Sequence, residues 1–148
     1  MSYIKNLSIK QKLLINTEKV QILEPTKNDK VFVLFLPSNE IHELGLMYLN
    51  YEILLNGYQS IYLGESIPIE SLIDLKNYFE KITFVSYFTV EPKQEEINDY
   101  IKEFTSKILK DTPHEALLIG RMTEFIDSKD LSSNVKVFHN IEELTNSL

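Results

Sequence analysis

The chain has 148 residues, of which 43% are hydrophobic and 25% charged, a composition typical of one globular domain with a buried core. Its net charge of -7 argues against direct nucleic-acid binding, because phosphate contacts need clustered lysines and arginines. The lack of cysteine excludes disulfides, thiolate metal sites and a cysteine nucleophile. No apolar run approaches the roughly 20 residues of a membrane helix, and no signal peptide is recognisable, so we expect a cytoplasmic protein without a membrane partner.

The first segment, from Tyr3 to about Leu23, predicts an amphipathic helix that ends before Pro25. Its apolar face is broad for a lone helix, and it is formed by Ile4, Leu7, Leu14 and Ile15. We therefore expect an N-terminal helix within residues 1–25, a polar linker at Thr26–Lys30, and a main domain over residues 30–148.

Beyond the linker, short apolar runs alternate with segments of helical periodicity. The expected strands are Val31–Leu36, Gln59–Leu63, Ile82–Phe88, Ala116–Ile119 and Val135–His139. The expected helices are Leu44–Asn56, Pro68 to about Lys81, Lys93 to about Lys110, and Glu142–Ser147. This alternation predicts an α/β fold with a parallel sheet covered on both faces. At this length the commonest solution is a flavodoxin-like (Rossmann-like) five-stranded sheet of order 2-1-3-4-5.

In that strand order, ligands bind beyond the carboxyl ends of the strands, where the winding direction reverses. Three loops should meet there, at Pro37–His42, Thr89–Pro92 and Gly120–Thr123. His42, one of only three histidines, therefore lies at the edge where a ligand is expected. Glu40 is placed to accept a hydrogen bond from one imidazole nitrogen, which would fix the tautomer and raise the basicity of the other nitrogen.

Several other kinds of site are poorly supported by the sequence. A zinc centre would need a second histidine or a cysteine at ligand spacing, and neither common Gly-rich phosphate loop is present. A phosphorelay receiver would need an acidic cluster after the first strand and a lysine after the fifth, where His139 stands. Glu40, Glu43 and Glu52 form no pair suited to acid–base catalysis, so we expect no enzymatic activity.

A set of positions near the predicted ligand edge matches a known motif. They are Glu40, His42, Gly45, Ser86, Phe88 and Gly120. Their order, Glu-x-His-x-x-Gly, Ser-x-Phe and Gly, resembles the cobalamin-binding signature Asp-x-His-x-x-Gly, Ser-x-Leu and Gly-Gly. The runs His42–Leu46 and Ile61–Leu72 are similar to the C-terminal sensory domain of MerR-type transcriptional regulators that bind cobalamin, some of which sense light through adenosylcobalamin. The likeness extends from about Tyr3 to the C-terminus.

The resemblance implies a role for each matched position. His42 would be the lower axial ligand of cobalt and would displace the cofactor's own dimethylbenzimidazole base, the arrangement called base-off and His-on. Glu40 would orient the imidazole, and Gly45 would allow close approach of the cofactor. Ser86 and Gly120 would line a slot for the displaced nucleotide tail.

The sequence departs from the signature at three places. Glu40 is one methylene longer than the usual aspartate, and Ser-Tyr-Phe at residues 86–88 is bulkier than Ser-x-Leu. Arg121, the only arginine of the chain, replaces the second glycine. Its guanidinium would either block the tail slot or pair with the tail phosphate, and the sequence leaves both readings open.

The family resemblance implies a sensor that binds a corrinoid and changes its assembly state. In such regulators a helix-turn-helix and a helical bundle precede the sheet domain, so DNA contact would come from a domain absent from this chain. Residues 1–25 resemble the last helix of that bundle, and their apolar face predicts a homo-oligomer. Two alternatives stay open: a corrinoid-carrying module of a methyltransferase or mutase, and a degenerate fold that serves only dimerisation.

Overall fold

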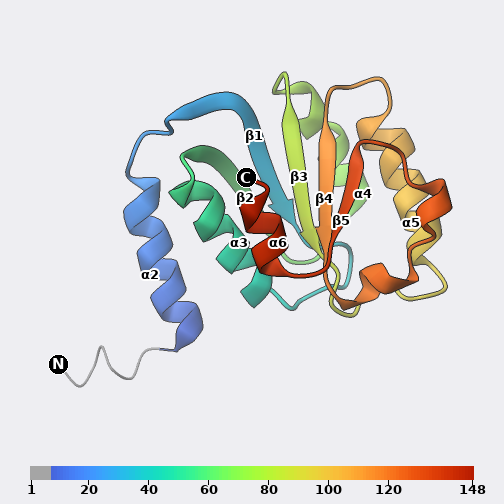
Figure 1. Ribbon diagram of the computed structural model, residues 1–148, viewed down its shortest axis with the longest axis horizontal. Coiled ribbons are helices and arrows are strands. Elements are labelled where there is room, and N and C mark those ends of the chain that lie inside the picture. The colour runs from blue at the N-terminus through green and yellow to red at the C-terminus, as the bar shows by residue number, and fades with distance from the viewer. Residues whose placement is uncertain (1–7) are drawn as a thin grey trace.

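The computed structural model describes residues 8–148 as a five-stranded parallel sheet flanked by helices (Figure 1). The strands are β1 (Lys27–Phe35), β2 (Tyr58–Gly64), β3 (Ile82–Tyr87), β4 (Glu115–Ile119) and β5 (Val135–Phe138). Their order is β2-β1-β3-β4-β5, and each neighbouring pair runs parallel. The predicted α/β, flavodoxin-like order 2-1-3-4-5 is therefore confirmed.

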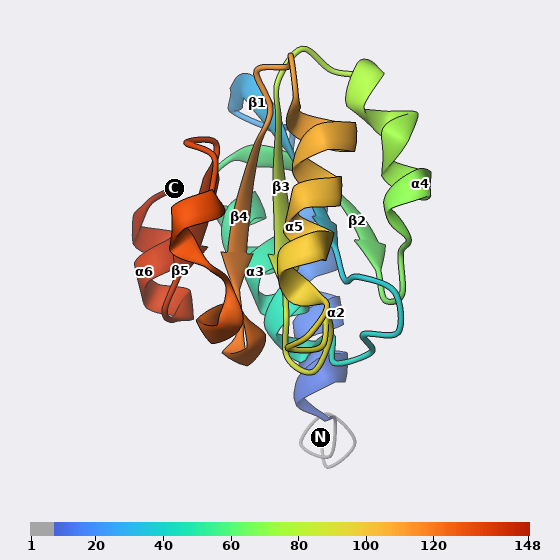
Figure 2. The ribbon, with the colours of Figure 1, turned by 90° about the vertical axis from the view of Figure 1, so that its right-hand side faces the viewer.

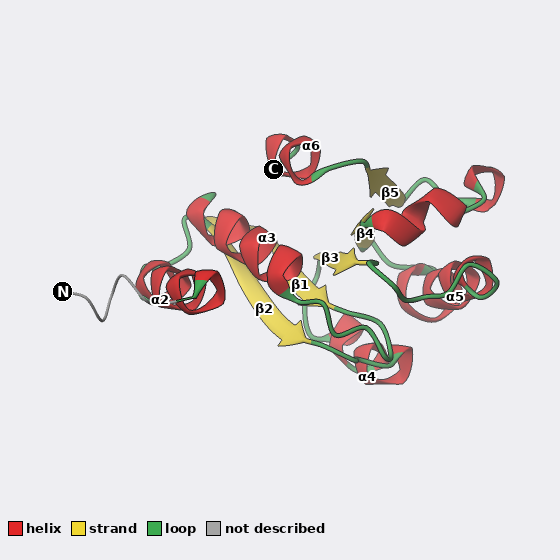
Figure 3. Ribbon diagram, turned by 90° about the horizontal axis from the view of Figure 1, so that it is seen from below, coloured by secondary structure: helices red, strands yellow, loops and turns green. Residues whose placement is uncertain are grey.

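Helices cover both faces of the sheet (Figure 3). One face carries α3 (Leu44–Leu55) and α6 (Ile141–Asn146), and the other carries α4 (Ile69–Ile73) and α5 (Ile97–Phe104). Two 3-10 turns, Arg121–Phe125 and Ser128–Asp130, connect β4 to β5. Within residues 8–148, no helix is long and apolar enough to cross a membrane.

The uninterrupted apolar run of β1 is explained by burial on both sides of the sheet. Val33 and Phe35 belong to the core beneath α4 and α5, whereas Phe32 and Leu34 belong to the core beneath α3 and α6. Side chains alternate between the two faces of a strand, so a strand buried on both faces needs apolar residues at every position.

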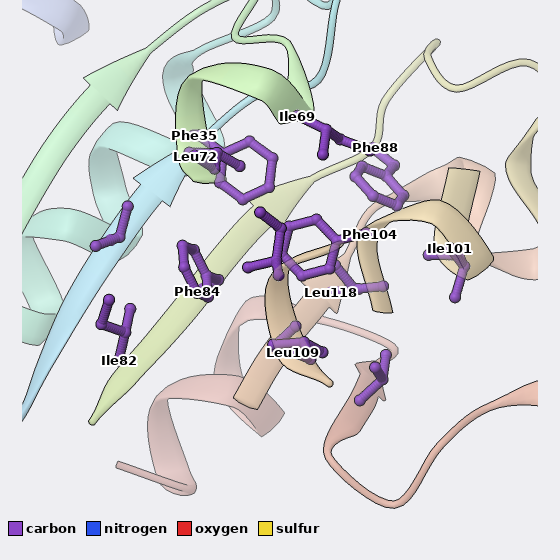
Figure 4. Packing of buried hydrophobic residues seen from close by; sticks show 14 of the residues in the cluster. Phe35, Ile69, Leu72, Ile82, Phe84, Phe88, Ile101, Phe104, Leu109 and Leu118 are labelled. Atoms are coloured by element: carbon purple, nitrogen blue, oxygen red, sulfur yellow. The ribbon is translucent and has the colours of Figure 1, made fainter. Parts of the chain in front are cut away.

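Aromatic rings fill the core on the α4 and α5 side (Figure 4). The Phe104 ring stacks on Phe35 at a centroid distance of 5.8 Å and meets Phe84 edge to face at 5.5 Å. This packing joins α5 to β1 and β3.

The N-terminal helix α2 (Ile9–Gln21) begins at a capping box, in which Ser8 Oγ accepts from the Gln11 amide and the Gln11 side chain accepts from the Ser8 amide. The helix packs against α3. Leu14 and Ile15 remain 52% and 43% exposed. The predicted start at Tyr3, with Ile4 and Leu7, lies outside the described residues.

Three predicted boundaries were wrong. The segment Thr26–Lys30 is not a linker, because β1 begins at Lys27 and the amides of Thr26 and Lys27 both donate to the Gly57 carbonyl. The helix expected from Pro68 to Lys81 ends at Ile73 and continues as a 3-10 turn at Leu75–Asn77. The helix expected from Lys93 begins only at Ile97, and it ends in a π-helical turn, Thr105–Leu109, that keeps its last apolar residues in the core.

Candidate functional site

The carboxyl ends of all five strands point to the same edge of the sheet, at the lower side of Figures 1 and 2. The loop between β1 and α3 and the loop between β3 and α5 leave from neighbouring strands there, because β1 and β3 pair directly. This arrangement brings together segments that are about 50 residues apart in the sequence, and the Glu40 side chain joins them.

Oxygen Oε1 of Glu40 binds the backbone of the β3–α5 loop. It accepts hydrogen bonds from the amides of Thr89 at 2.8 Å, Val90 at 2.6 Å and Glu91 at 3.2 Å. The Glu40 side chain is fully buried, so these amides replace the water that the carboxylate loses on folding. Three convergent amides hold the second loop against the first.

The other oxygen, Oε2, organises the residues that follow Glu40. It accepts from the amide of Ile41 at 3.0 Å and from that of His42 at 3.3 Å, and it lies 2.9 Å from His42 Nδ1. Burial alone would raise the pKa of Glu40, but the amide of Val90, the imidazole of His42 and the other amides stabilise its charged form. Together they lower the pKa of Glu40 from 4.5 to about 2, so the carboxylate is ionised at neutral pH.

The geometry at His42 determines which imidazole nitrogen is available. An ionised carboxylate only accepts hydrogen bonds, so Nδ1 of His42 carries the proton that it donates to Glu40. Nε2 then has a free lone pair, and within residues 8–148 it makes no hydrogen bond. The His42 side chain is 57% exposed, which leaves this lone pair accessible as a metal ligand.

Within residues 8–148, no group of three or more histidine, aspartate, glutamate or cysteine side chains is arranged to hold a metal ion. His42 can therefore act as a single ligand to a metal that brings its other ligands with it, such as one held in a macrocycle. The surroundings suit a large, partly apolar ligand, because Ile41, Leu44 and Val90 are 62%, 48% and 50% exposed. These three side chains belong to the segments that carry or bind Glu40, and such exposed apolar groups mark interaction sites.

Gly45 lies in the first turn of α3, where a ring of the protein itself approaches it. A Cβ at Gly45 would lie only 2.6 Å from Cε2 of Tyr87 and 2.9 Å from Cδ2. The resemblance to the cobalamin-binding motif implied that this glycine admits a cofactor. In the structure the bare backbone at Gly45 admits the Tyr87 ring.

Ser86 and Phe88, expected to line or border a tail slot, are instead core residues. Ser86 is fully buried, and its hydroxyl donates to the Phe35 carbonyl at 2.6 Å. Phe88 is also fully buried and meets the Tyr100 ring edge to face at a centroid distance of 5.7 Å. Neither side chain faces an open slot.

The local backbone explains why a glycine occupies position 120. Its φ of 116° lies in a region that side chains rarely adopt, and a Cβ there would collide with the Phe88 carbonyl, which accepts the Met122 amide. The neighbouring Arg121 is exposed and borders a cavity of about 300 Å³ at the ends of β3, β4 and β5. The remaining walls of that cavity include Tyr87 and His139.

Two further contacts at this edge were not predicted from the sequence. Glu43 accepts from the hydroxyl of Tyr62 at 3.1 Å and lies 3.6 Å from the Lys10 amino group, which ties α2 to the start of α3. Burial of the ring and the negative charge of Glu43 raise the pKa of Tyr62 above its usual range. The bulk of Tyr87 is visible in the sequence, as the middle residue of Ser-Tyr-Phe. The backbone amides of residues 89–91 cannot be recognised from the sequence as donors to Glu40.

Comparison with known proteins supports the fold. No protein-family model matches the sequence, and no curated protein matches it. Among solved structures, the monomethylamine corrinoid protein of Methanosarcina barkeri is similar, with a TM-score of 0.69 at 14% identity over 94% of this chain and 65% of that one. A novel cobalamin-binding protein from Desulfitobacterium hafniense DCB-2 has a TM-score of 0.55 at 10% identity, over 98% of this chain and 72% of that one.

These identities are low, so the likeness establishes the fold alone. The present chain spans about 65% of the length of the Methanosarcina protein.

Proposed function

We propose that this chain is a corrinoid-binding domain in which Nε2 of His42 coordinates the cobalt of a cobalamin. One observation carries the proposal: a buried, ionised Glu40 holds Nδ1 of an exposed imidazole at the ligand-binding edge of the sheet. The two similar structures support it, because the description of one is a corrinoid protein and that of the other a cobalamin-binding protein.

The residues at the edge fit this role. A corrin ring already supplies nitrogen ligands to cobalt, so the protein would need to add only one more, and His42 would provide it as an accessible imidazole. Ile41, Leu44 and Val90 offer apolar contact to the rim of such a ring. When bound, the corrinoid would supply the cobalt centre and its upper ligand, while the chain holds the ring and sets the basicity of the lower ligand through Glu40.

We further propose that the domain is a sensor of a MerR-type regulator that acts in the cytoplasm, with cobalamin or adenosylcobalamin as its signal. The runs at residues 42–46 and 61–72 support this reading. The net charge of -7 leaves DNA contact to another domain. The second candidate, a corrinoid carrier for a methyltransferase, is compatible with the likeness to the Methanosarcina corrinoid protein. Light scattering with adenosylcobalamin, in the dark and after illumination, separates them: a sensor of this kind changes its assembly state, and a carrier does not.

Binding itself is tested by mixing the protein with hydroxocobalamin and recording absorbance after gel filtration. We expect co-elution with a base-off, His-on spectrum. His42→Ala should abolish that spectrum and weaken binding sharply, whereas Glu40→Gln should cost less, about 10- to 100-fold, without removing the ligand. Lys81→Ala, which removes an exposed side chain before β3 at the opposite edge of the sheet, is the control and should bind as wild type. The proposal is wrong if wild type binds no corrinoid, with or without a nucleotide tail, or if His42→Ala binds with the same affinity and spectrum.

A further inference from the structure

A cobalamin bound through His42 raises a question about the part of the cofactor that the imidazole displaces. Cobalamin carries its own lower base at the end of a nucleotide tail that is covalently attached to the corrin ring. Once an imidazole takes the lower position, this tail must enter the protein beneath the ring or remain outside it. Whether the tail enters the protein is a question that rests on the proposed function.

The space beside the first turn of α3, three residues beyond His42, is filled by Tyr87. The Tyr87 ring approaches the Gly45 backbone so closely that three of its carbons would lie within 3.0 Å of a Cβ there. Tyr87 is half-buried and packs with the core between the sheet and the helices α3 and α6. The bare glycine backbone that could admit a ligand group is therefore already in van der Waals contact with a side chain of the protein.

The next residues along the chain provide no opening beside Tyr87. Ser86 and Phe88 are fully buried, and the Ser86 hydroxyl is engaged with the Phe35 carbonyl. Gly120 lies against the Phe88 backbone. Each of the small or polar groups that could border a slot thus contacts protein, and a slot would require that one of them move.

The cavity of about 300 Å³ lies at the ends of β3, β4 and β5, and Tyr87, whose ring contacts Gly45, forms part of its wall. Its volume is at the lower limit of the roughly 300–1,000 Å³ of sites that enclose ligands. A base, a ribose and a phosphate would need both this cavity and the space that the Tyr87 ring occupies. Arg121 also borders the cavity, but Tyr87 is the lining residue whose ring contacts Gly45.

We propose that Tyr87 is a specificity-determining residue that excludes the nucleotide tail, so that the site prefers corrinoids without a nucleotide, such as cobinamide, over complete cobalamin. The preference follows from the cost of burying the tail. Complete cobalamin must either displace a packed aromatic ring or leave its tail in solvent, whereas cobinamide binds to His42 without either requirement.

The test is a titration of the wild-type protein with diaquacobinamide and with hydroxocobalamin, followed through the absorbance change on imidazole ligation. We expect wild type to bind cobinamide at least about 10-fold more tightly than cobalamin. Tyr87→Ala should reduce this ratio at least about 10-fold, mainly through tighter cobalamin binding. Tyr87→Phe keeps the ring and should retain the wild-type ratio. Tyr87→Leu provides a second variant without the ring, and far-UV circular dichroism checks that each variant folds.

The outcomes separate this inference from the proposed function. If wild type binds both corrinoids equally or prefers cobalamin, in a manner that His42→Ala abolishes, the corrinoid site stands and the role of Tyr87 is wrong. An unchanged ratio in folded Tyr87→Ala and Tyr87→Leu also overturns it. If neither corrinoid binds, or both bind independently of His42, the proposed function fails, and this inference fails with it.

Discussion

Replacing Glu40 with glutamine should destabilise the protein by an amount that depends on pH in a defined way. The two oxygens of Glu40 accept from five backbone amides and one imidazole. An amide has only one acceptor oxygen, and its NH₂ group would face N–H donors in either orientation. At least two backbone amides therefore lose their partner in Glu40→Gln, in a site from which water is excluded.

The magnitude follows from the pKa of Glu40, which folding lowers from 4.5 to about 2. Because one pKa unit corresponds to about 1.4 kcal/mol, the ionised carboxylate contributes roughly 3 kcal/mol to the free energy of unfolding. A folded-state pKa below the unfolded value means that this stabilisation is complete above pH 4.5 and is lost as the pH falls towards 2. Urea denaturation of wild type and Glu40→Gln should differ by roughly 3 kcal/mol at pH 7, and the difference should shrink steadily below pH 4.5.

A matched control is available in Glu95, an exposed glutamate near the start of α5. Glu95→Gln removes the same charge and should change the free energy of unfolding by less than about 0.5 kcal/mol at any pH. The reasoning is refuted if Glu40→Gln is as stable as Glu95→Gln at pH 7. A large difference that stays constant between pH 7 and pH 3 would equally show that ionisation of Glu40 is not the source of the stability.

Two further predictions concern stability and assembly. Gly120→Ala should lower the free energy of unfolding by more than about 2 kcal/mol, because the φ of 116° is strained for alanine and the new Cβ collides with the Phe88 carbonyl; a loss below about 1 kcal/mol in urea denaturation would contradict this. The chain should self-associate through α2, since burying the exposed half of Leu14 and of Ile15 gains about 1 kcal/mol each. Light scattering should show a dimer for wild type and a monomer for the variant Leu14→Glu with Ile15→Glu, and a wild type that is monomeric at high concentration would refute the idea.

Much of the fold could be predicted from the sequence because burial determines the local pattern of apolar residues. A strand covered on both faces must be apolar at every position, and Val31–Leu36 is. The helix that follows ends at Gly57, whose φ of 90° is the conformation that a glycine after a helix allows. The strand order was then constrained by the right-handed crossovers of parallel strands.

Backbone hydrogen bonding does not determine which side chains are apolar, so the predicted ends of several strands and helices were wrong. Because residues Lys27–Lys30 are polar, the sequence predicts a linker there. In the structure their main chain extends β1, while their side chains stay largely exposed. At the other boundaries, α4 gives way to a 3-10 turn and α5 begins late, although their apolar side chains remain in the core. Side-chain periodicity reports burial, and it does not report where the helical hydrogen bonds begin or end.

Some features of the candidate site can likewise be predicted from the sequence, and others depend on tertiary packing. The pairing of Glu40 with His42 was predictable, because the two residues lie two positions apart in one loop at the end of a buried strand. The three amides that lower the pKa of Glu40 come from the β3–α5 loop, and any residue except proline supplies such an amide. Likewise, only the pairing of β1 with β3 brings the Tyr87 ring onto Gly45. The sequence therefore determined which imidazole is presented, whereas tertiary packing decided how firmly it is held and what space remains beside it.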